Sequence, residues 1–174
     1  KEDHQMSKQP TVAIVMGSKS DWPVLEYTYN TLKEFGVEAT VKILSAHRTP
    51  HEAAAFAENA AANGYKVIIG AAGGAAHLSG VLAGHTTLPV IGIPVKGWAL
   101  DGMDSLLSTL QMPKGVPVAT VAIGKAGAIN AAVLAVQIMA LSDADLGEKM
   151  VQYKKDMAAD VLKDDAELQA ELGS

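Results

Sequence analysis

Apolar and polar positions alternate along the chain in blocks of two kinds, short apolar runs and longer stretches with helical spacing. The run Thr11–Met16 is almost wholly apolar and rich in β-branched residues, as is typical of a strand buried on both faces. After it, Ser20 or Asp21 can cap a helix that has Pro23 in its first turn and apolar positions as far as Gly36. The pattern predicts a strand followed by a helix.

The same alternation repeats four more times. Further strands are predicted at residues 39–44, 67–70, 90–93 and 116–119, and further helices at 50–62, 76–83, 104–110 and 126–141. Parallel neighbours need crossover connections, and helical crossovers cover both faces of a sheet. We therefore expect an α/β fold, a flavodoxin-like three-layer sandwich with a five-stranded parallel sheet. Ligands of such folds bind beyond the carboxyl ends of the strands.

A last helical pattern, at residues 145–172, has no strand to return to. Its apolar positions share one face and are Met150, Tyr153, Met157, Val161, Leu168 and Leu172. This extra C-terminal helix needs another surface, which is either its own domain or a neighbouring subunit. We divide the chain into a disordered N-terminal segment at 1–9, an α/β domain at 10–142 and a C-terminal amphipathic helix at 143–174.

Composition and charge narrow the classes of function. The chain has 174 residues, is 49% hydrophobic and contains no cysteine, which excludes disulfides and thiolate chemistry. Residues 143–174 carry four Lys and nine Asp or Glu, which accounts for the whole net charge of -5. The balanced remainder has no basic stripe, so nucleic-acid binding is not expected. The sequence has neither an apolar run of about 20 residues nor an apolar signal core, which predicts a cytoplasmic protein without a membrane span.

The loop after the first predicted strand, G-S-K-S-D at Gly17 to Asp21, gathers polar groups at a helix N-terminus. Free backbone N–H groups there can bind a phosphate, and Asp21 can accept hydrogen bonds from ribose hydroxyls. Simple helix capping by Ser20 or Asp21 also explains this loop.

The loop after the second strand reads S-A-H-R-T-P, from Ser45 to Pro50. Pro50 holds the preceding residue extended and opens the next helix, so that His47 and Arg48 lie on the loop. A guanidinium group can pair bidentately with phosphate, and an imidazole beside it can move a proton near neutral pH. An incidental surface histidine is the alternative at this point.

The loop after the third strand, G-A-A-G-G-A-A-H-L-S-G at Gly70 to Gly80, consists mostly of the smallest residues. Such a run lets backbone approach a flat ligand closely, although tight helix packing would explain the alanines. Packing does not explain the pair Gly73 and Gly74. We expect His77 to lie inside the helix and favour a structural role for it over a second active-site imidazole.

The fourth loop, residues 94–104, contains Trp98 and fits either a lid or a subunit contact. His51 and His85 have no supporting neighbours in the sequence and are expected at the surface. No metal-ligand spacing, P-loop or G-x-G-x-x-G is present, so neither a metal nor a cofactor is expected.

Taken together, five ordered blocks resemble the family of N5-carboxyaminoimidazole ribonucleotide mutases, the PurE family, in its class I form. These blocks are G-S-K-S-D, S-A-H-R-T-P, G-A-A-G-G-A-A-H-L-S-G, L-P-V-I-G-I-P-V and D-S-L-L-S-T-L-Q-M-P-K-G-V-P-V-A-T-V-A-I-G-K-A-G-A, and the match runs from about residue 11 to 141. The resemblance implies a flavodoxin-like subunit in a homo-octamer, with C-terminal helices that reach onto neighbours.

The resemblance also implies roles for single residues. His47 is the catalytic residue that transfers the proton, and the substrate-binding residues are Ser18, Asp21, Ser45, Arg48, Ala72 and Gly73. Gly17, Ser20, Gly74 and His77 are further candidates.

The implied reaction moves a carboxylate from the exocyclic nitrogen of an aminoimidazole ribonucleotide to ring carbon C4 in purine biosynthesis, without ATP, metal or biotin. A related class uses free carbon dioxide as an aminoimidazole ribonucleotide carboxylase, and it typically lacks the G-G-A-A-H-L form present here. A non-catalytic nucleotide-binding module is the alternative from another class. The chain departs from the mutase pattern at Ser79, where proline is usual, and at His85.

Overall fold

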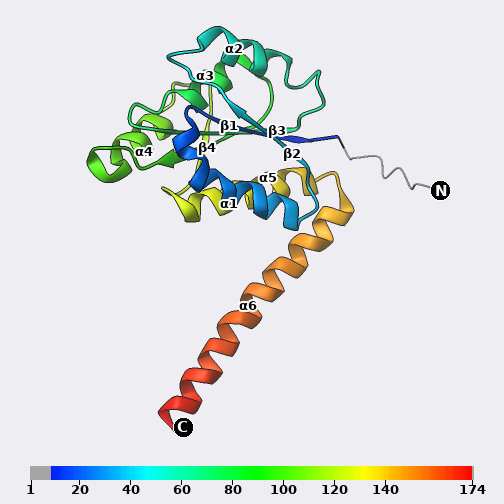
Figure 1. Ribbon diagram of the computed structural model, residues 1–174. Coiled ribbons are helices and arrows are strands. Elements are labelled where there is room, and N and C mark those ends of the chain that lie inside the picture. The colour runs from blue at the N-terminus through cyan, green and yellow to red at the C-terminus, as the bar shows by residue number, and fades with distance from the viewer. Residues whose placement is uncertain (1–8, 174) are drawn as a thin grey trace, which may run out of the picture. The chain divides into compact units, whose positions relative to one another are not determined.

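The computed structural model describes residues 9–173, so that only Gln9 of the predicted disordered segment lies within the described part (Figure 1). The chain divides into two compact units, one up to Ala135 and one from Val136 onward. The first unit contains a five-stranded sheet, and the boundary lies inside a helix. No helix among residues 9–173 is long and apolar enough to cross a membrane.

The elements follow one another as the hydrophobic pattern predicts. The strands are β1 (Val12–Met16), β2 (Ala39–Ile43), β3 (Val67–Gly73), β4 (Val90–Val95) and β5 (Ala119–Thr120). The helices are α1 (Trp22–Glu34), α2 (Pro50–Asn59), α3 (Leu78–His85), α4 (Met103–Leu110), α5 (Lys125–Ala140) and α6 (Ala144–Leu172), with 3-10 turns η1 (Lys19–Asp21) and η2 (Leu100–Gly102).

All strands are parallel, in the order β2-β1-β3-β4-β5. This is the flavodoxin-like order, in which the chain changes direction between β1 and β3 and leaves a crevice at their carboxyl ends. The predicted α/β fold class and parallel sheet are confirmed. β1 is wholly buried, as its unbroken apolar run predicts.

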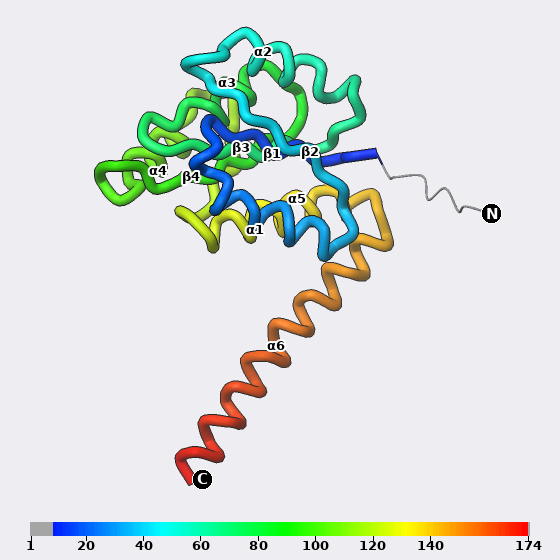
Figure 2. Tube along the Cα trace, viewed as in Figure 1, coloured from blue at the N-terminus to red at the C-terminus, as the bar shows by residue number. Residues whose placement is uncertain are grey.

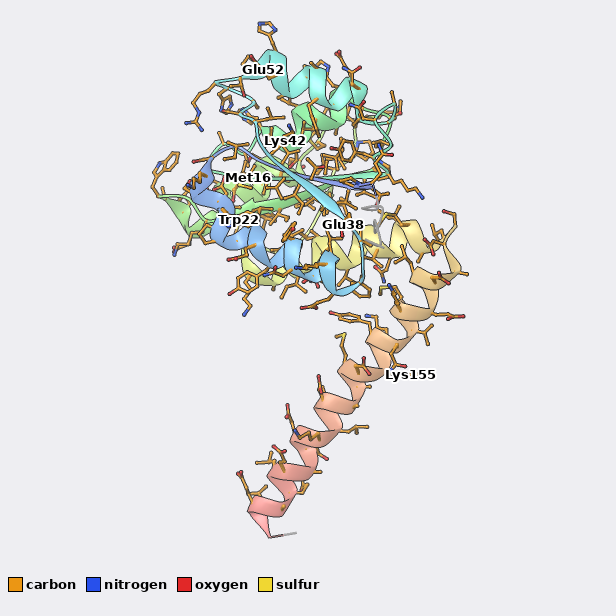
Figure 3. The ribbon with its side chains drawn as sticks, turned by 45° about the vertical axis from the view of Figure 1, so that its right-hand side comes forward. Met16, Trp22, Glu38, Lys42, Glu52 and Lys155 are labelled. Atoms are coloured by element: carbon orange, nitrogen blue, oxygen red, sulfur yellow. The ribbon has the colours of Figure 1, made fainter. Side chains whose placement is uncertain are left out.

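Helices cover both faces of the sheet. α2 and α3 lie side by side on one face, where their buried residues pack with Ala13, Val15 and Ile68 (Figure 2). α1 and the first part of α5 lie on the other face, and the buried Thr28 hydroxyl of α1 donates a hydrogen bond of 2.8 Å to the Ala128 carbonyl. Glu52 on α2 and Trp22 on α1 accordingly lie on opposite sides of Met16 (Figure 3).

Several boundaries differ from the prediction, and the differences at β5, β3 and α3 bear on the site. β5 is not at residues 116–119, because Pro117 has no N–H for the ladder, and only Ala119 and Thr120 pair with β4. β3 continues to Gly73, so α3 begins at Leu78 and not at residue 76. Ala71 to Gly73, which were predicted as loop, therefore end the strand, and Ala76 and His77, which were predicted as helix, precede the helix.

The second unit contains the end of α5 and the 29-residue α6. Asp143 caps α6, since its side chain accepts a hydrogen bond from the Leu146 N–H at 3.1 Å. Leu146 and Met150 are buried. Farther along the helix several apolar side chains are exposed, namely Val151, Met157, Val161, Leu162, Leu168 and Leu172.

Candidate functional site

A cavity of about 540 Å³ opens at the carboxyl ends of β1, β2, β3 and β4. It lies at the point where the strand order reverses, which is where ligands bind in sheets of this topology. Its lining comes from all four loops that the sequence singles out: Gly17, Ser18, Ser20, Asp21, Ser45, Ala46, His47, Arg48, Ala72, Gly73, Ala75, His77, Leu78, Val95, Lys96, Gly97 and Trp98.

The loop after β1 is a 3-10 turn that Ser18 caps. The Ser18 hydroxyl accepts hydrogen bonds from the Ser20 N–H at 3.3 Å and the Ser20 hydroxyl at 2.9 Å. Asp21 occupies the N-cap position of α1 but makes no capping hydrogen bond with its side chain. Asp21 therefore holds the predicted N-cap position without capping the helix through its side chain, and Ser18 caps the preceding 3-10 turn with its hydroxyl.

The Asp21 carboxyl is perturbed by its surroundings. Burial raises its pKa above the usual value, and this outweighs a hydrogen bond with the Ser18 backbone and the attraction of the Arg48 guanidinium, both of which lower it. A carboxylate that is partly withdrawn from water gains more from hydroxyl donors than an exposed one does. Asp21 is thus suited to accept hydrogen bonds from a sugar.

The loop after β2 is held by its own polar side chains. The Ser45 hydroxyl accepts hydrogen bonds from the Arg48 N–H at 3.1 Å and from Arg48 Nε at 3.3 Å, and the Thr49 hydroxyl accepts from the Ser45 N–H at 2.8 Å. Arg48 Nη2 donates to the Gly17 carbonyl at 2.7 Å, which ties this loop to the one after β1. The guanidinium is therefore fixed beside the predicted phosphate loop.

His47 meets a second imidazole across the cavity. His47 Nε2 lies 2.7 Å from His77 Nδ1, and the two rings cross edge to face at 77° with centroids 4.8 Å apart. One nitrogen must donate and the other accept, so the hydrogen bond cannot persist with both rings doubly protonated. The pair can therefore hold one mobile proton at the cavity surface.

His77 is not inside a helix, as the sequence suggested, but at the N-cap position of α3. Its loop is held from α4, where the Ser108 hydroxyl accepts a hydrogen bond of 3.0 Å from the Ala76 N–H. The structural role favoured for His77 does not account for this position, because the ring is exposed in the cavity beside His47.

The glycines at the end of β3 are explained by the close approach of β4 and the segment that follows it. A Cβ on Gly73 would lie 3.1 Å from the Val95 carbonyl oxygen, and one on Gly74 would lie 3.2 Å from the Trp98 ring. Gly74 also has a φ of +63°, which glycine adopts at no steric cost. Gly73 lines the cavity, whereas the buried Gly74 lies beneath Trp98 and does not.

Ser79, which departs from the family pattern, is a packing residue in the first turn of α3. It is buried, and its hydroxyl donates a hydrogen bond of 3.0 Å to the Gly70 carbonyl. The first turn of a helix tolerates serine and proline alike.

The structure therefore brings together all but one of the predicted site residues, Gly74 being the exception. His51 is exposed as expected. His85 is also exposed as expected, and its Nδ1 lies 3.0 Å from Glu58 Oε1. Within residues 9–173 no three His, Cys, Asp or Glu side chains lie together as a metal site would require.

Sequence reasoning assigned no site residue to the segment after β4, which it interpreted as a lid or a subunit contact. Lys96, Gly97 and Trp98 line the cavity, and Lys96 forms an ion pair with Asp101. The one available signal was their position directly after a predicted strand, on the same edge of the sheet as the other loops.

Comparisons with known proteins agree with this geometry. The family model described as AIR carboxylase matches residues 11–160. The N5-carboxyaminoimidazole ribonucleotide mutase of Bacillus subtilis is 52% identical over 92% of this chain and 99% of its own length. The enzyme of that name from Escherichia coli K12 is 51% identical over 87% and 90%.

A solved structure supports the same relationship. The crystal structure of Treponema denticola PurE superposes with a TM-score of 0.84 at 32% identity, over 92% of this chain and 99% of that one. The match to the family model, at residues 11–160, spans the sheet, the four loops and the first part of α6. The chain therefore belongs to the AIR carboxylase family, the family of PurE.

Proposed function

We propose that this protein is an N5-carboxyaminoimidazole ribonucleotide mutase, an isomerase of purine biosynthesis. The observation that carries the proposal is the cavity at the β1/β3 crossing point, which joins an anion-binding loop to the hydrogen-bonded pair of His47 and His77. The names of the relatives with about half of their residues in common support it.

The polar loops supply the means to bind a ribonucleotide. Arg48 can pair with the phosphate, and the turn that Ser18 caps presents backbone N–H groups beside it. Asp21 would then accept hydrogen bonds from the ribose, and the small walls at Ala72 and Gly73 would leave room for the flat heterocycle. Binding would fix the imidazole near His47.

The reaction proceeds in two steps of opposite proton flow. In the first, the bond between the exocyclic nitrogen and the carboxylate carbon breaks, carbon dioxide leaves, and the nitrogen takes a proton from His47. In the second, ring carbon C4 attacks the retained carbon dioxide, and His47 removes the C4 proton. No net proton is consumed, and His47 returns to its starting state. Retention of carbon dioxide requires that water be excluded.

His77 would act as a positioning residue through its 2.7 Å contact with His47. It would fix the orientation and tautomer of the His47 ring, as a hydrogen-bond partner on the other ring nitrogen does for many catalytic imidazoles. The variant His77→Asn should lower kcat about tenfold and change the pH profile of kcat, with little change in KM. A pH profile identical to that of wild type would contradict this role.

A direct spectroscopic assay tests the proposed function. Wild-type protein given N5-carboxyaminoimidazole ribonucleotide should form the 4-carboxylate without ATP or metal. Tight ribonucleotide binding with no conversion would instead indicate a non-catalytic binding module.

The family model is described as AIR carboxylase, and this description favours a second candidate function, a carboxylase that uses free carbon dioxide. Incubation with aminoimidazole ribonucleotide and bicarbonate without ATP separates the two. Efficient product formation at low bicarbonate would replace the mutase proposal with the carboxylase.

The mutase would act as a homo-octamer in the cytoplasm, with α6 packed on a neighbouring subunit. The exposed apolar side chains of α6, among them Met157, Val161 and Leu168, support such packing. Light scattering should give eight times the chain mass of 18.1 kDa. The variant Val161→Asp should reduce that mass, and a wild-type monomer would overturn the proposal.

A further inference from the structure

Trp98 is exposed to a degree that is unusual for the largest side chain. Its relative accessibility is 92%, whereas tryptophan is highly buried on average because it loses so much apolar surface to water when exposed. The side chain is nevertheless part of the cavity lining. An aromatic ring kept at the edge of a ligand cavity points to a role with the ligand.

One edge of the ring lies against backbone. A Cβ on Gly97 would lie 3.2 Å from the Gly74 nitrogen, so the ends of β3 and β4 approach too closely for side chains at these positions. The six-membered ring of Trp98 lies against Gly74 in the space that a side chain would fill. The glycines thus form a seat for one part of the indole and leave the rest beside the cavity.

The strand order places this ring at the end of the cavity away from the phosphate loop. Arg48 follows β2 and Ser18 follows β1, whereas Trp98 follows β4, which is two strands beyond β1. Adjacent strands lie about 4.8 Å apart, so roughly 10 Å separates the strands that carry Ser18 and Trp98. A ribonucleotide with its phosphate at Arg48 can place its heterocycle toward the indole over that span.

We propose that Trp98 contacts the substrate directly, as the aromatic wall that covers the heterocycle of the bound ribonucleotide and helps to retain carbon dioxide. The inference rests on the proposed function. A flat indole suits a flat aminoimidazole, since stacking of an aromatic side chain on a base is sequence-tolerant and substantial. The ring also adds the apolar surface that the glycine and alanine residues around it do not supply.

Fluorescence tests the contact directly, because the chain has only two tryptophans. In the variant Trp22→Phe, Trp98 is the single emitter. Aminoimidazole ribonucleotide should change its emission saturably and reduce its quenching by acrylamide. Inorganic phosphate, which can fill only the Arg48 end, should leave the emission unchanged. Unchanged emission when calorimetry shows the site filled with the ribonucleotide would overturn the proposal.

Kinetics provide the second arm. Trp98→Ala should raise KM by about tenfold to a hundredfold and release more aminoimidazole ribonucleotide per turnover, while Trp98→Phe retains most of the wild-type KM. Leu100→Ala is the matched control, since Leu100 lies in the same segment and is 71% exposed but does not line the cavity. A KM for Trp98→Ala within twofold of wild type contradicts the contact.

The Trp98 contact can be distinguished both from self-association of the chain and from the proposed activity. Trp98 emission that follows protein concentration but not ligand would assign the ring to contact with a second copy of the chain and overturn the proposal. Failure of the wild-type protein to convert the substrate would reject the proposed function, whereas the fluorescence titration would still report whether Trp98 contacts the ribonucleotide.

Discussion

The two sides of the cavity are built by different means. On the β1 and β2 side, hydrogen bonds between loop side chains and backbone hold Ser45, Arg48 and Asp21 in place. On the β3 and β4 side, close backbone packing through Gly73, Gly74 and Gly97 shapes the wall, and serine hydroxyls of α4 hold it from behind the cavity. Substitution of a single polar side chain should therefore alter phosphate binding on the first side. On the second side, a change in side-chain volume should have the larger effect.

Substitution of His47, which lies between the two sides, should have the largest effect on turnover. His47→Asn keeps a polar side chain but cannot transfer a proton at neutral pH, so turnover should fall by about 10²- to 10⁴-fold. The melting temperature and the calorimetric Kd for aminoimidazole ribonucleotide serve as controls and should change little. A variant that retains the wild-type rate would remove His47 from the mechanism.

Substitution of Arg48 on the polar side should have the second-largest effect, on KM. Arg48→Lys retains the positive charge but loses the planar fork that binds phosphate and the donors that reach Ser45 and Gly17. Steady-state kinetics should show KM raised by roughly tenfold to a hundredfold, which corresponds to about 1.4 to 2.8 kcal/mol, with a smaller change in kcat. An unchanged KM would mean that charge alone suffices.

A substitution on the packed side should lower the stability of the fold. Gly74→Ala places a side chain at a φ of +63° and against the Trp98 ring, so the free energy of unfolding should fall by about 1 to 2 kcal/mol from the backbone alone. Urea denaturation measures it. Adding Trp98→Ala should recover the crowding cost but not the backbone cost. Equal loss in the single and double variants would show that the ring can simply move away.

Asp21 should give the smallest effect, with a defined sign. Its pKa in the folded protein is raised by burial, so the folded state holds the proton more tightly than the unfolded state. Burial therefore destabilises the protein above that raised pKa, and the penalty disappears as the pH falls toward the ordinary value. Asp21→Asn should slightly raise the melting temperature at pH 7 but not near pH 3, while weakening ribonucleotide binding. A lower melting temperature at pH 7 would contradict this account.

The difference between the two sides also decides what the sequence could predict. Hydrophobic runs located β1, β3 and β4 because buried parallel strands carry unbroken apolar residues, although β3 and β4 extend beyond their predicted ends. The polar loops were found from Asp21, His47 and Arg48, whose chemistry is visible in the residue type itself. Placement at the ends of neighbouring strands then brings them together.

The packed side could not be predicted in the same way. The contact between Gly74 and Trp98 joins residues 24 positions apart, and nothing local to either one signals it. The contact between His77 and His47 was not predicted, because the alanines around His77 favoured a helix there, whereas β3 extends to Gly73 and α3 begins after His77. Small residues indicate close approach but do not identify the partner.

The short last strand has a consequence for hydrogen exchange. β5 pairs with β4 through Ala119 and Thr120, and beyond it the N–H groups of Val121 and Gly124 donate to Gly92 and Pro94. Because these hydrogen bonds are few and lie at the edge of the sheet, they can break while the centre of the sheet stays intact. The amides of Val121 and Gly124 should therefore exchange through a low-energy local opening, while those of β1 and β3 exchange only when the whole domain unfolds.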